Sequence, residues 1–296
     1  MSLVWKKRLI IYIKNIIKML KKLYLDIHKN YFIKKLKLFI KSYGIGSYLN
    51  SKVKGTKEEY VKLYEECLKN PNRIDNFIKA NFTSEEENFI NNLALLTQIT
   101  KKSTELNFNH GFLLHECLKK YLSKSNEKKI YIVETGTARG FSSVVMSYLL
   151  SKYDIEYEIH TIDILPHKTK MYWNCISDPI NGKVSREELL IDYNKYLKNI
   201  YFHEGQSIDV LRNLKLDRVH FAFLDGEHDY SDIKHEYEYV KDRNLKNDII
   251  FCDDYIHGRF DGIVKFINEI KNQNLYKVDI LDSNSDRGYA ILERID

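Results

Sequence analysis

The sequence predicts an α/β fold with a mostly parallel sheet, preceded by a helical extension. From residue 128 onward, short apolar runs typical of strands alternate with segments of helical periodicity. Each of the first five runs is followed by an acidic or small polar residue, whereas the residues before 128 show no strand pattern. Such alternation is typical of parallel strands covered by helices on both faces.

Composition limits the class of protein. The chain has 296 residues, of which 44% are hydrophobic and 30% charged, enough for one large α/β domain with an additional segment or for two modest domains. No secretory signal is evident, and the cysteines lack Cys-x-x-Cys spacing. We therefore expect a cytoplasmic protein without structural disulfides. The four cysteines are Cys67, Cys117, Cys175 and Cys252.

Charge is distributed unevenly along the chain. Residues 1–54 contain 14 lysines and arginines but one acid, Asp26, so their net charge is +13, whereas residues 55–296 carry −7. Apolar and lysine positions in this basic arm recur at helical spacing, and its apolar run Leu9–Ile13 is far too short to cross a bilayer. The pattern fits an amphipathic helix on an anionic membrane surface, a helix packed on the body, or a dimer seam.

Residues 55–125 are predicted to form a helical cap. Thr56 with Glu59 and Thr83 with Glu86 have the spacing of capping boxes. This stretch carries no recognisable chemical motif, so its expected role is to cover the body or to serve as an oligomer surface. Residues 126–296 form the third predicted region, the α/β domain.

The elements of that domain follow in order. Ser185 and Glu188 again have capping-box spacing, which predicts that a helix begins there. We expect strands at 129–133, 157–163, 200–205, 219–225 and 248–254, a terminal hairpin of strands 276–281 and 288–294, and helices at 141–153, 185–199, after residue 230 and at 261–273.

The first strand ends in Glu134 and leads into a loop of small residues before a helix. Small residues let a ligand approach the backbone, and the helix N-terminus offers free N–H groups, although plain packing explains such a turn equally well. Glu134 argues against a pyrophosphate-binding turn, because such a turn gains nothing from a carboxylate at the strand end, whereas a cationic or hydroxyl-bearing ligand could use one. The candidate cofactor-binding residues here are Glu134, Gly136, Thr137, Ala138 and Gly140.

The next two strands end in polar residues of other kinds. Asp163 suits a bidentate contact with ribose hydroxyls, and its alternative role is to cap a turn. Gln206 and Ser207, after the third strand, could meet an adenine edge or simply cap the loop.

Acidic residues follow strands four and five. Asp225 and His228 lie three residues apart, and the adjacent Asp253 and Asp254 precede His257. One such aspartate would be read as a turn cap. Three carboxylates at neighbouring strand ends repel one another unless a cation is bound. Oxygen ligands alone indicate a hard ion such as Mg²⁺.

Together these residues resemble the class I S-adenosylmethionine-dependent methyltransferases. "VETGTARG" (133–140) is similar to their first motif, acid-x-Gly-x-x-x-Gly, and Asp163 matches the acid that holds the cofactor ribose. The resemblance covers residues 126–296. It implies a Rossmann-like seven-stranded sheet of order 3-2-1-4-5-7-6 with an antiparallel seventh strand, and S-adenosyl-L-methionine as cofactor.

Within that class, "FLDGEHDYSD" (223–232) and "IIFCDDYIHGRFDGI" (249–263) resemble the metal-dependent O-methyltransferases of sugars and small molecules, including the macrolide and aminocoumarin sugar enzymes. The resemblance implies that Asp225, Asp253 and Asp254 bind a divalent metal, with Mg²⁺ expected, and that Asp225 also contacts the cofactor and takes part in catalysis. His228 falls where the macrolide-sugar enzymes have their general base. The implied acceptor is a hydroxyl of a sugar, a glycan or another small molecule.

Two other functions stay open at this stage. An NAD-binding Rossmann oxidoreductase would need a pyrophosphate turn, which Glu134 disfavours. A non-catalytic cofactor-binding or membrane-associated module would leave the strand-end carboxylates dispensable. Nucleic acid is disfavoured as a partner because the body is acidic.

Overall fold

The computed structural model describes residues 51–69, 81–282 and 287–296, and residues 51–296 form one compact unit. The predicted basic arm, residues 1–54, therefore lies outside the described residues except for its last four positions.

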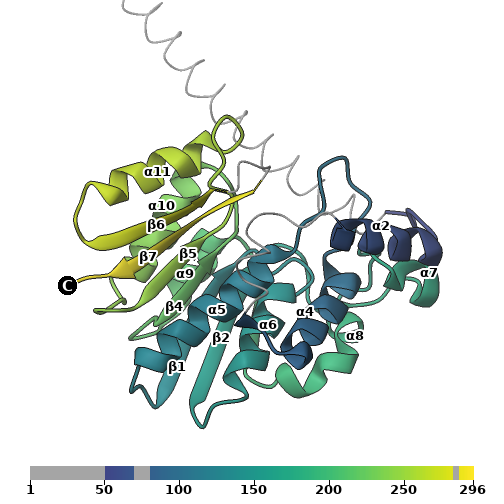
Figure 1. Cartoon of the computed structure of the whole chain (residues 1–296), viewed down its shortest axis with the longest axis horizontal. Helices are drawn as coiled ribbons and strands as arrows, with labels where there is room; N and C mark the ends of the chain where they lie inside the picture. The colour runs from purple at the N-terminus through teal and green to yellow at the C-terminus, as the bar shows by residue number, and fades with distance from the viewer. Residues whose placement is uncertain (1–50, 70–80, 283–286) are drawn as a thin grey trace, which may run out of the picture. The chain divides into compact units, whose positions relative to one another are not determined.

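A seven-stranded sheet forms the centre of the unit, in the order β3-β2-β1-β4-β5-β7-β6 (Figure 1). The first five strands pair in parallel, and β7 pairs antiparallel with both β5 and β6. The predicted strand order and the antiparallel hairpin are thus confirmed. The strands are β1 (Lys129–Thr135), β2 (Glu156–Asp163), β3 (Ile200–Glu204), β4 (Phe221–Leu224), β5 (Ile249–Cys252), β6 (Tyr276–Asp282) and β7 (Gly288–Arg294).

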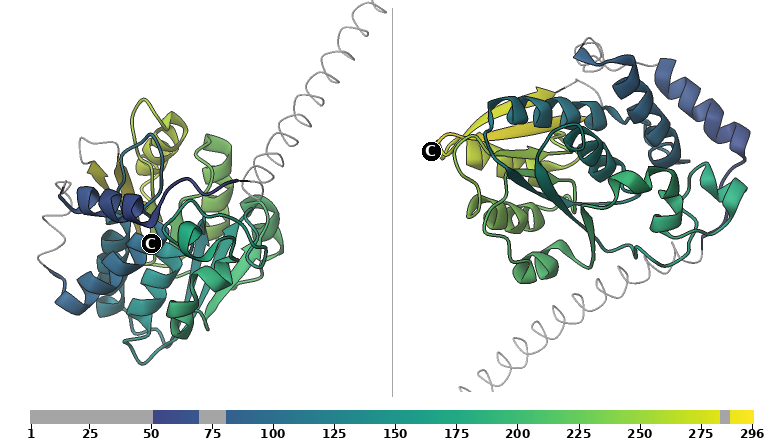
Figure 2. Two further views of the ribbon diagram at one scale, coloured as in Figure 1. Left: turned by 90° about the vertical axis from the view of Figure 1, so that its right-hand side faces the viewer. Right: turned by 90° about the horizontal axis from the view of Figure 1, so that it is seen from below.

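Alternate side chains of each central strand enter two separate cores. In β4, Phe221 and Phe223 belong to one hydrophobic cluster, whereas Ala222 and Leu224 belong to the other. Helices cover both faces, as Figure 2 shows from two further directions. On the first face lie α4 (Ser84–Thr97), α5 (Asn109–Lys124) and α6 (Phe141–Leu150), and on the second α9 (Ser207–Asn213), α10 (Tyr230–Lys241) and α11 (Asp261–Lys271).

The predicted helices before residue 125 are present. The capping box of Thr83 and Glu86 is complete at the start of α4, and Thr56 and Glu59 bond in the same reciprocal way at the start of α2 (Lys57–Lys69). The rings of Phe89 in α4 and Tyr148 in α6 stack with centroids 3.7 Å apart, one of the contacts that hold these helices on the sheet.

The single helix predicted at 185–199 is wrong. The capping box of Ser185 and Glu188 is present, but α8 (Arg186–Leu189) stops after one turn. At Leu190 the backbone leaves the helical region, with φ −97° and ψ 15°, and its buried side chain packs against Gly140. The chain continues as a 3₁₀ helix, Ile191–Tyr196, and a further short helix, α7 (Ser177–Asn181), lies earlier in the same insertion.

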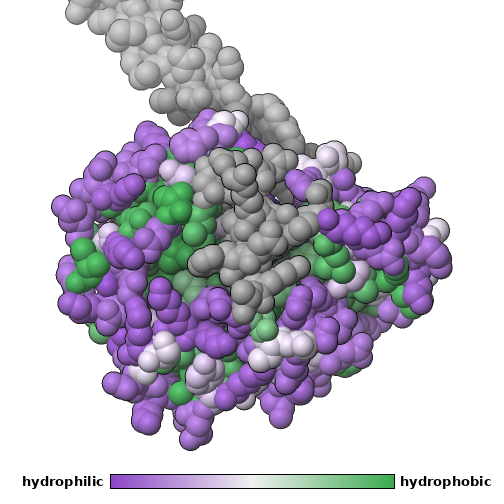
Figure 3. Space-filling model, in the orientation of Figure 1, coloured by the Kyte–Doolittle hydropathy of each residue, from purple (hydrophilic) through white to green (hydrophobic). Residues whose placement is uncertain are grey.

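The surface is mostly hydrophilic on the face shown in Figure 3, with apolar side chains gathered over β6 and β7. None of the helices in the described part of the chain is long and apolar enough to cross a membrane.

Candidate active site

The loop after β1 is folded tightly against the ends of its two neighbouring strands. Gly136 N–H donates to the Ile162 carbonyl of β2 at 2.9 Å. Gly136, Ala138 and Gly140 have φ values of 89°, 45° and 87°, the left-handed region that favours glycine. A Cβ at Gly136 would stand 1.9 Å from the Asp225 carbonyl oxygen, so no larger residue fits. The loop is therefore held close to the carboxyl edge of the sheet.

Glu134 lies beneath this loop and is fully buried. Its carboxylate accepts hydrogen bonds from the Ser142 and Ser143 hydroxyls of α6, and from Thr161 of β2 at 2.5 Å. Burial raises its pKa, and the three hydroxyl donors oppose that rise. Glu134 thus joins β1, β2 and the first turn of α6, so it fixes the loop from below. Its part in cofactor binding stays a prediction.

Asp163 also braces the loop. Its two carboxylate oxygens accept from the backbone N–H groups of Ala138 at 2.6 Å and Leu165 at 2.7 Å. Each carboxylate oxygen has a second acceptor site, so these bonds leave room for the predicted ribose contact.

Arg186 was missed by the sequence reasoning, which assigned no role to the insertion at 164–199. Its side chain is 2% exposed, donates to the Ala138 carbonyl at 2.8 Å and to the Leu165 carbonyl at 3.2 Å, and lies over the Trp173 ring. Its guanidinium is 3.9 Å from Asp163. The insertion therefore supplies the buried cation that holds the loop and its acid together. The capping box at Ser185 predicts that Arg186 lies in the first turn of a helix. The sequence pattern around it does not predict that its side chain is buried.

Glu236 is a second residue that the sequence reasoning missed. Its side chain, on α10, is 1% exposed and accepts from Thr135 Oγ1 at 2.9 Å and from Ser207. Burial raises its pKa to about 7. Its second oxygen faces Gly226, where a Cβ would stand 2.8 Å away. Glu236 links the ends of β1 and β4 to the start of α9, where Gln206 stands at the N-cap position. The adenine contacts predicted for Gln206 and Ser207 stay predictions.

The predicted acids after β4 and β5 lie close together with His228. Asp253 is 1% and Asp254 8% exposed, and His228 Nδ1 lies 3.2 Å from Asp254 Oδ2. Arg287, which immediately precedes β7, donates to Asp253 at 3.2 Å and to Asp254 at 3.4 Å. Burial raises the pKa of Asp225, and the carboxylates of Asp253 and Asp254 raise it further. The cluster thus holds three carboxylates, one imidazole and one guanidinium, and only the guanidinium was not predicted.

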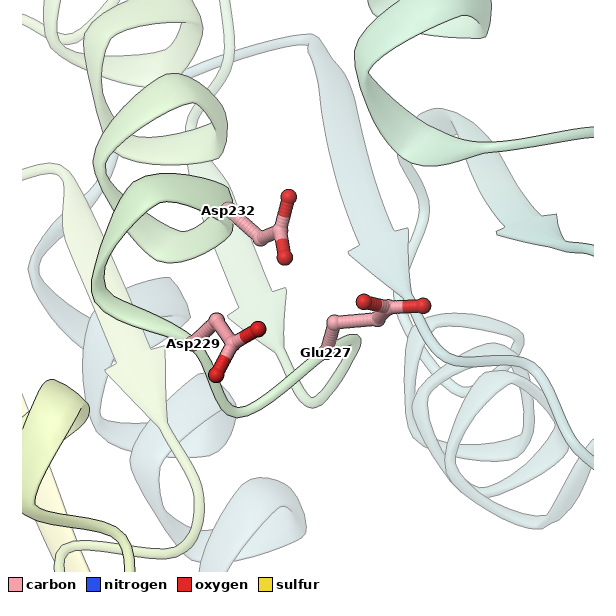
Figure 4. Close-up of side chains that lie close together, drawn as sticks. All are labelled: Glu227, Asp229 and Asp232. Atoms are coloured by element: carbon pink, nitrogen blue, oxygen red, sulfur yellow. The ribbon is translucent and has the colours of Figure 1, made fainter. Parts of the chain in front are cut away.

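A different group of acidic residues brings its carboxylate oxygens closer together than the predicted metal ligands do. Glu227, Asp229 and Asp232 each place a ligand atom within 4.8 Å of the others, and theirs is the only such set of three in the described part of the chain (Figure 4). Glu227 and Asp229 are exposed, in the loop between β4 and α10. The oxygens of the predicted metal ligands are farther apart than this, with Arg287 bonded to two of the three acids.

A family model described as a methyltransferase domain matches residues 133–255, which span the β1 loop through the acids after β5. Among solved structures, cofactor-bound Rv0187 from MTB is 12% identical with a TM-score of 0.51, and the O-methyltransferase TomG from Streptomyces achromogenes, involved in tomaymycin synthesis and solved with S-adenosylmethionine, is 14% identical with a TM-score of 0.50. Each alignment covers 76% of this chain and 97% of the other. No curated protein matches the chain.

The sheet order and the matched domain agree with each other. Residues 133–255 match a methyltransferase domain, and the fold is the Rossmann-like fold of the class I S-adenosylmethionine-dependent methyltransferases, with the loop after β1 at the position of the class's first motif. The matched domain favours a methyltransferase over the dehydrogenase that the sequence left open.

Proposed function

We propose that this enzyme transfers the methyl group of S-adenosylmethionine to a hydroxyl of a sugar, a glycan or another small molecule. The observation that carries the proposal is the cluster of Asp225, Asp253, Asp254 and His228 at the carboxyl edge of β4 and β5, beside the cofactor loop. Ligands of open parallel sheets bind at this edge. The O-methyltransferase TomG, which shares the fold, supports oxygen as the methylated atom.

His228 has the surroundings of a general base. Its Nδ1 faces Asp254 at 3.2 Å, its ring packs on Phe260 with centroids 4.3 Å apart, and its side chain is 37% exposed. When Nδ1 carries the proton shared with Asp254, Nε2 is free to accept one from an acceptor hydroxyl. The oxygen then attacks the methyl carbon in line with the departing sulfur, the S–C bond breaks, and the products are the methyl ether, S-adenosylhomocysteine and a protonated His228.

A divalent cation fits these residues in two respects: the type of ligand atom and the negative charge. Asp225, Asp253 and Asp254 supply only oxygen ligands, and with all three ionised Arg287 alone would leave two negative charges uncompensated. We propose that these three aspartates bind the ion and that Mg²⁺ is the natural one. The ion would stabilise the developing charge on the acceptor oxygen. Arg287 would then hold the acids in the absence of the ion.

Replacing Arg287 tests this assignment. In EDTA, Arg287→Met is expected to lower the free energy of unfolding by about 3–5 kcal/mol, because Asp253 keeps a buried charge without its partner. In MgCl₂ the variant should recover part of that loss, since the ion replaces the guanidinium. Urea unfolding in both buffers measures the two values.

Arg212→Met is the matched control, because Arg212 lies in an exposed ion pair, at 3.5 Å from Asp209. It should unfold like the wild type in both buffers. Equal stability of Arg287→Met in EDTA and in MgCl₂ would contradict a metal site at these acids. Calorimetric titration with Mn²⁺ adds a second readout, and binding should disappear in Asp253→Asn.

The basic arm supports a further part of the proposal. A +13 segment with helical apolar spacing is suited to an anionic membrane surface, where lipid-linked glycans are found. Contact of residues 1–54 with the membrane and self-association through the helices before residue 125 stay predictions.

A further inference from the structure

A small cavity opens beside the candidate base, and its walls bring a new set of residues to the site. It has a volume of about 180 Å³ and includes His228, Asp254 and Phe260 from the site described above. The remaining lining residues are Lys102, Thr104, Glu105, Asn107, Arg259 and Arg287. Residues 102–107 belong to the helical region that carries no motif, so this region contributes directly to the acceptor side of the site.

The aspartates at this cavity are buried, whereas two of its basic side chains are exposed. The buried aspartates are Asp253 and Asp254, and the exposed cations are Lys102 and Arg259. Neither cation forms an ion pair with another described residue, in contrast to Arg287, which is bonded to both acids. Partial desolvation of its ammonium group lowers the pKa of Lys102, and the guanidiniums of Arg287, Arg139 and Arg259 lower it further. The cations at the mouth therefore lie close enough to repel one another, and an anion would relieve that repulsion.

A larger cavity shares one wall with this one. It has a volume of about 670 Å³, within the range of small-molecule sites, and its lining includes Lys102, Thr104 and Glu105 as well as Leu63 and Leu106. The two cavities therefore border the same stretch of chain. A ligand anchored in the smaller cavity has room for a larger, partly apolar remainder.

We propose that the acceptor carries an anionic group, a phosphate or a carboxylate, which Lys102 and Arg259 bind while the hydroxyl to be methylated points to His228 and the buried acids. This assignment rests on the proposed function and names its substrate class. Guanidinium and ammonium groups recognise such oxyanions by charge-assisted hydrogen bonds. Glu105, an exposed carboxylate in the same wall, adds selection, since an anion placed on its side of the cavity would be repelled.

Equilibrium binding tests the proposal without requiring turnover. The wild type is saturated with S-adenosylhomocysteine in low-salt buffer with MgCl₂, and then titrated with glucose 1-phosphate, glucuronic acid or uncharged methyl glucoside. We expect the phosphate or the carboxylate probe to bind more tightly than methyl glucoside, and to weaken as NaCl is added. The stronger of the two anionic probes identifies the kind of anion.

Variants locate the site. Lys102→Met and Arg259→Met should each weaken the anionic probe about tenfold, the loss expected for one charge-assisted contact. Lys215→Met and Arg212→Met, which replace exposed cations outside the cavity lining, should leave it unchanged. All four positions are exposed, so folding should be preserved.

Three results would overturn the proposal: methyl glucoside binding as tightly as both anionic probes, no binding of either anion to the saturated wild type, or unchanged binding in Lys102→Met and Arg259→Met. Failure of the proposed function itself would be seen earlier and separately, as failure of S-adenosylhomocysteine to bind.

Discussion

His228→Ala is expected to lower kcat about 100- to 10,000-fold, the contribution of a well-placed general base. The reason is geometric: His228 is the imidazole that Asp254 orients, at 3.2 Å, beside the acids that would bind the metal ion. The dissociation constant of S-adenosylhomocysteine should change little, because the contacts of the cofactor loop do not involve this side chain. Steady-state kinetics with the acceptor found by a methylation screen, together with calorimetry, separate the two effects.

His235→Ala is the matched control for this variant. His235 is exposed on α10 and its Nδ1 contacts the Ser231 carbonyl at 2.6 Å, so it takes no part in the cluster. Its kcat should equal that of the wild type. A His228→Ala enzyme with wild-type kcat would exclude this imidazole as the base and leave the deprotonation to another group.

Gly136→Ala should both destabilise the protein and abolish cofactor binding. The added Cβ would stand 1.9 Å from the Asp225 carbonyl oxygen, and φ at this position is 89°. The backbone strain and the overpacking together cost about 2–5 kcal/mol. Because the loop must move away from β4 to relieve the clash, the cofactor site should be lost even where the fold survives. Urea unfolding and calorimetry with S-adenosylhomocysteine measure the two consequences.

Gly182→Ala is the control that separates the effect of backbone strain from the effect of a steric clash. Gly182 also has a positive φ, 71°, but no atom lies within 4 Å of the place that a Cβ would take. The variant should be destabilised only by this backbone strain, about 1–3 kcal/mol, and should bind the cofactor normally. If the two alanine variants bound S-adenosylhomocysteine equally well, the close approach of the loop to β4 would be irrelevant to the site.

Most of the fold could be predicted, because its signals are local. Apolar runs between turn residues marked all seven strands, and capping boxes marked two helix starts before residue 125. The order of the strands is a pairing between distant segments, which no local pattern contains, and it came from the family resemblance. The helix predicted at 185–199 failed because a tertiary contact, Leu190 against Gly140, ends it after one turn.

The candidate site was predictable only in part, for a related reason. Parallel strands bring their carboxyl ends to one edge, so the acids after β4 and β5 were expected together. Three basic residues of the site lie in segments that carry no motif: Arg186, Arg287 and Lys102. No local pattern predicts that segments so distant along the chain meet at the site. Glu236 had a signal that was not used.

That signal is its place on the helix. Glu236 stands on the apolar face of α10 with Ile233, Tyr237 and Val240, at the spacing of a buried helical stripe. A carboxylate at such a position must have a polar partner inside the protein. The partners proved to be Thr135 and Ser207, at the ends of the cofactor half of the site.

Methyl transfer to oxygen is tested most directly by product analysis. The enzyme is incubated with S-adenosylmethionine labelled with ¹³C in its methyl group, MgCl₂ and a mixture of neutral, phosphorylated and carboxylated sugars, and the products are examined by carbon-correlated NMR. We expect a new methoxy signal in the wild type and none in His228→Ala. A labelled methyl group on nitrogen or carbon, or a methoxy product of equal yield in both enzymes, would contradict the proposed function.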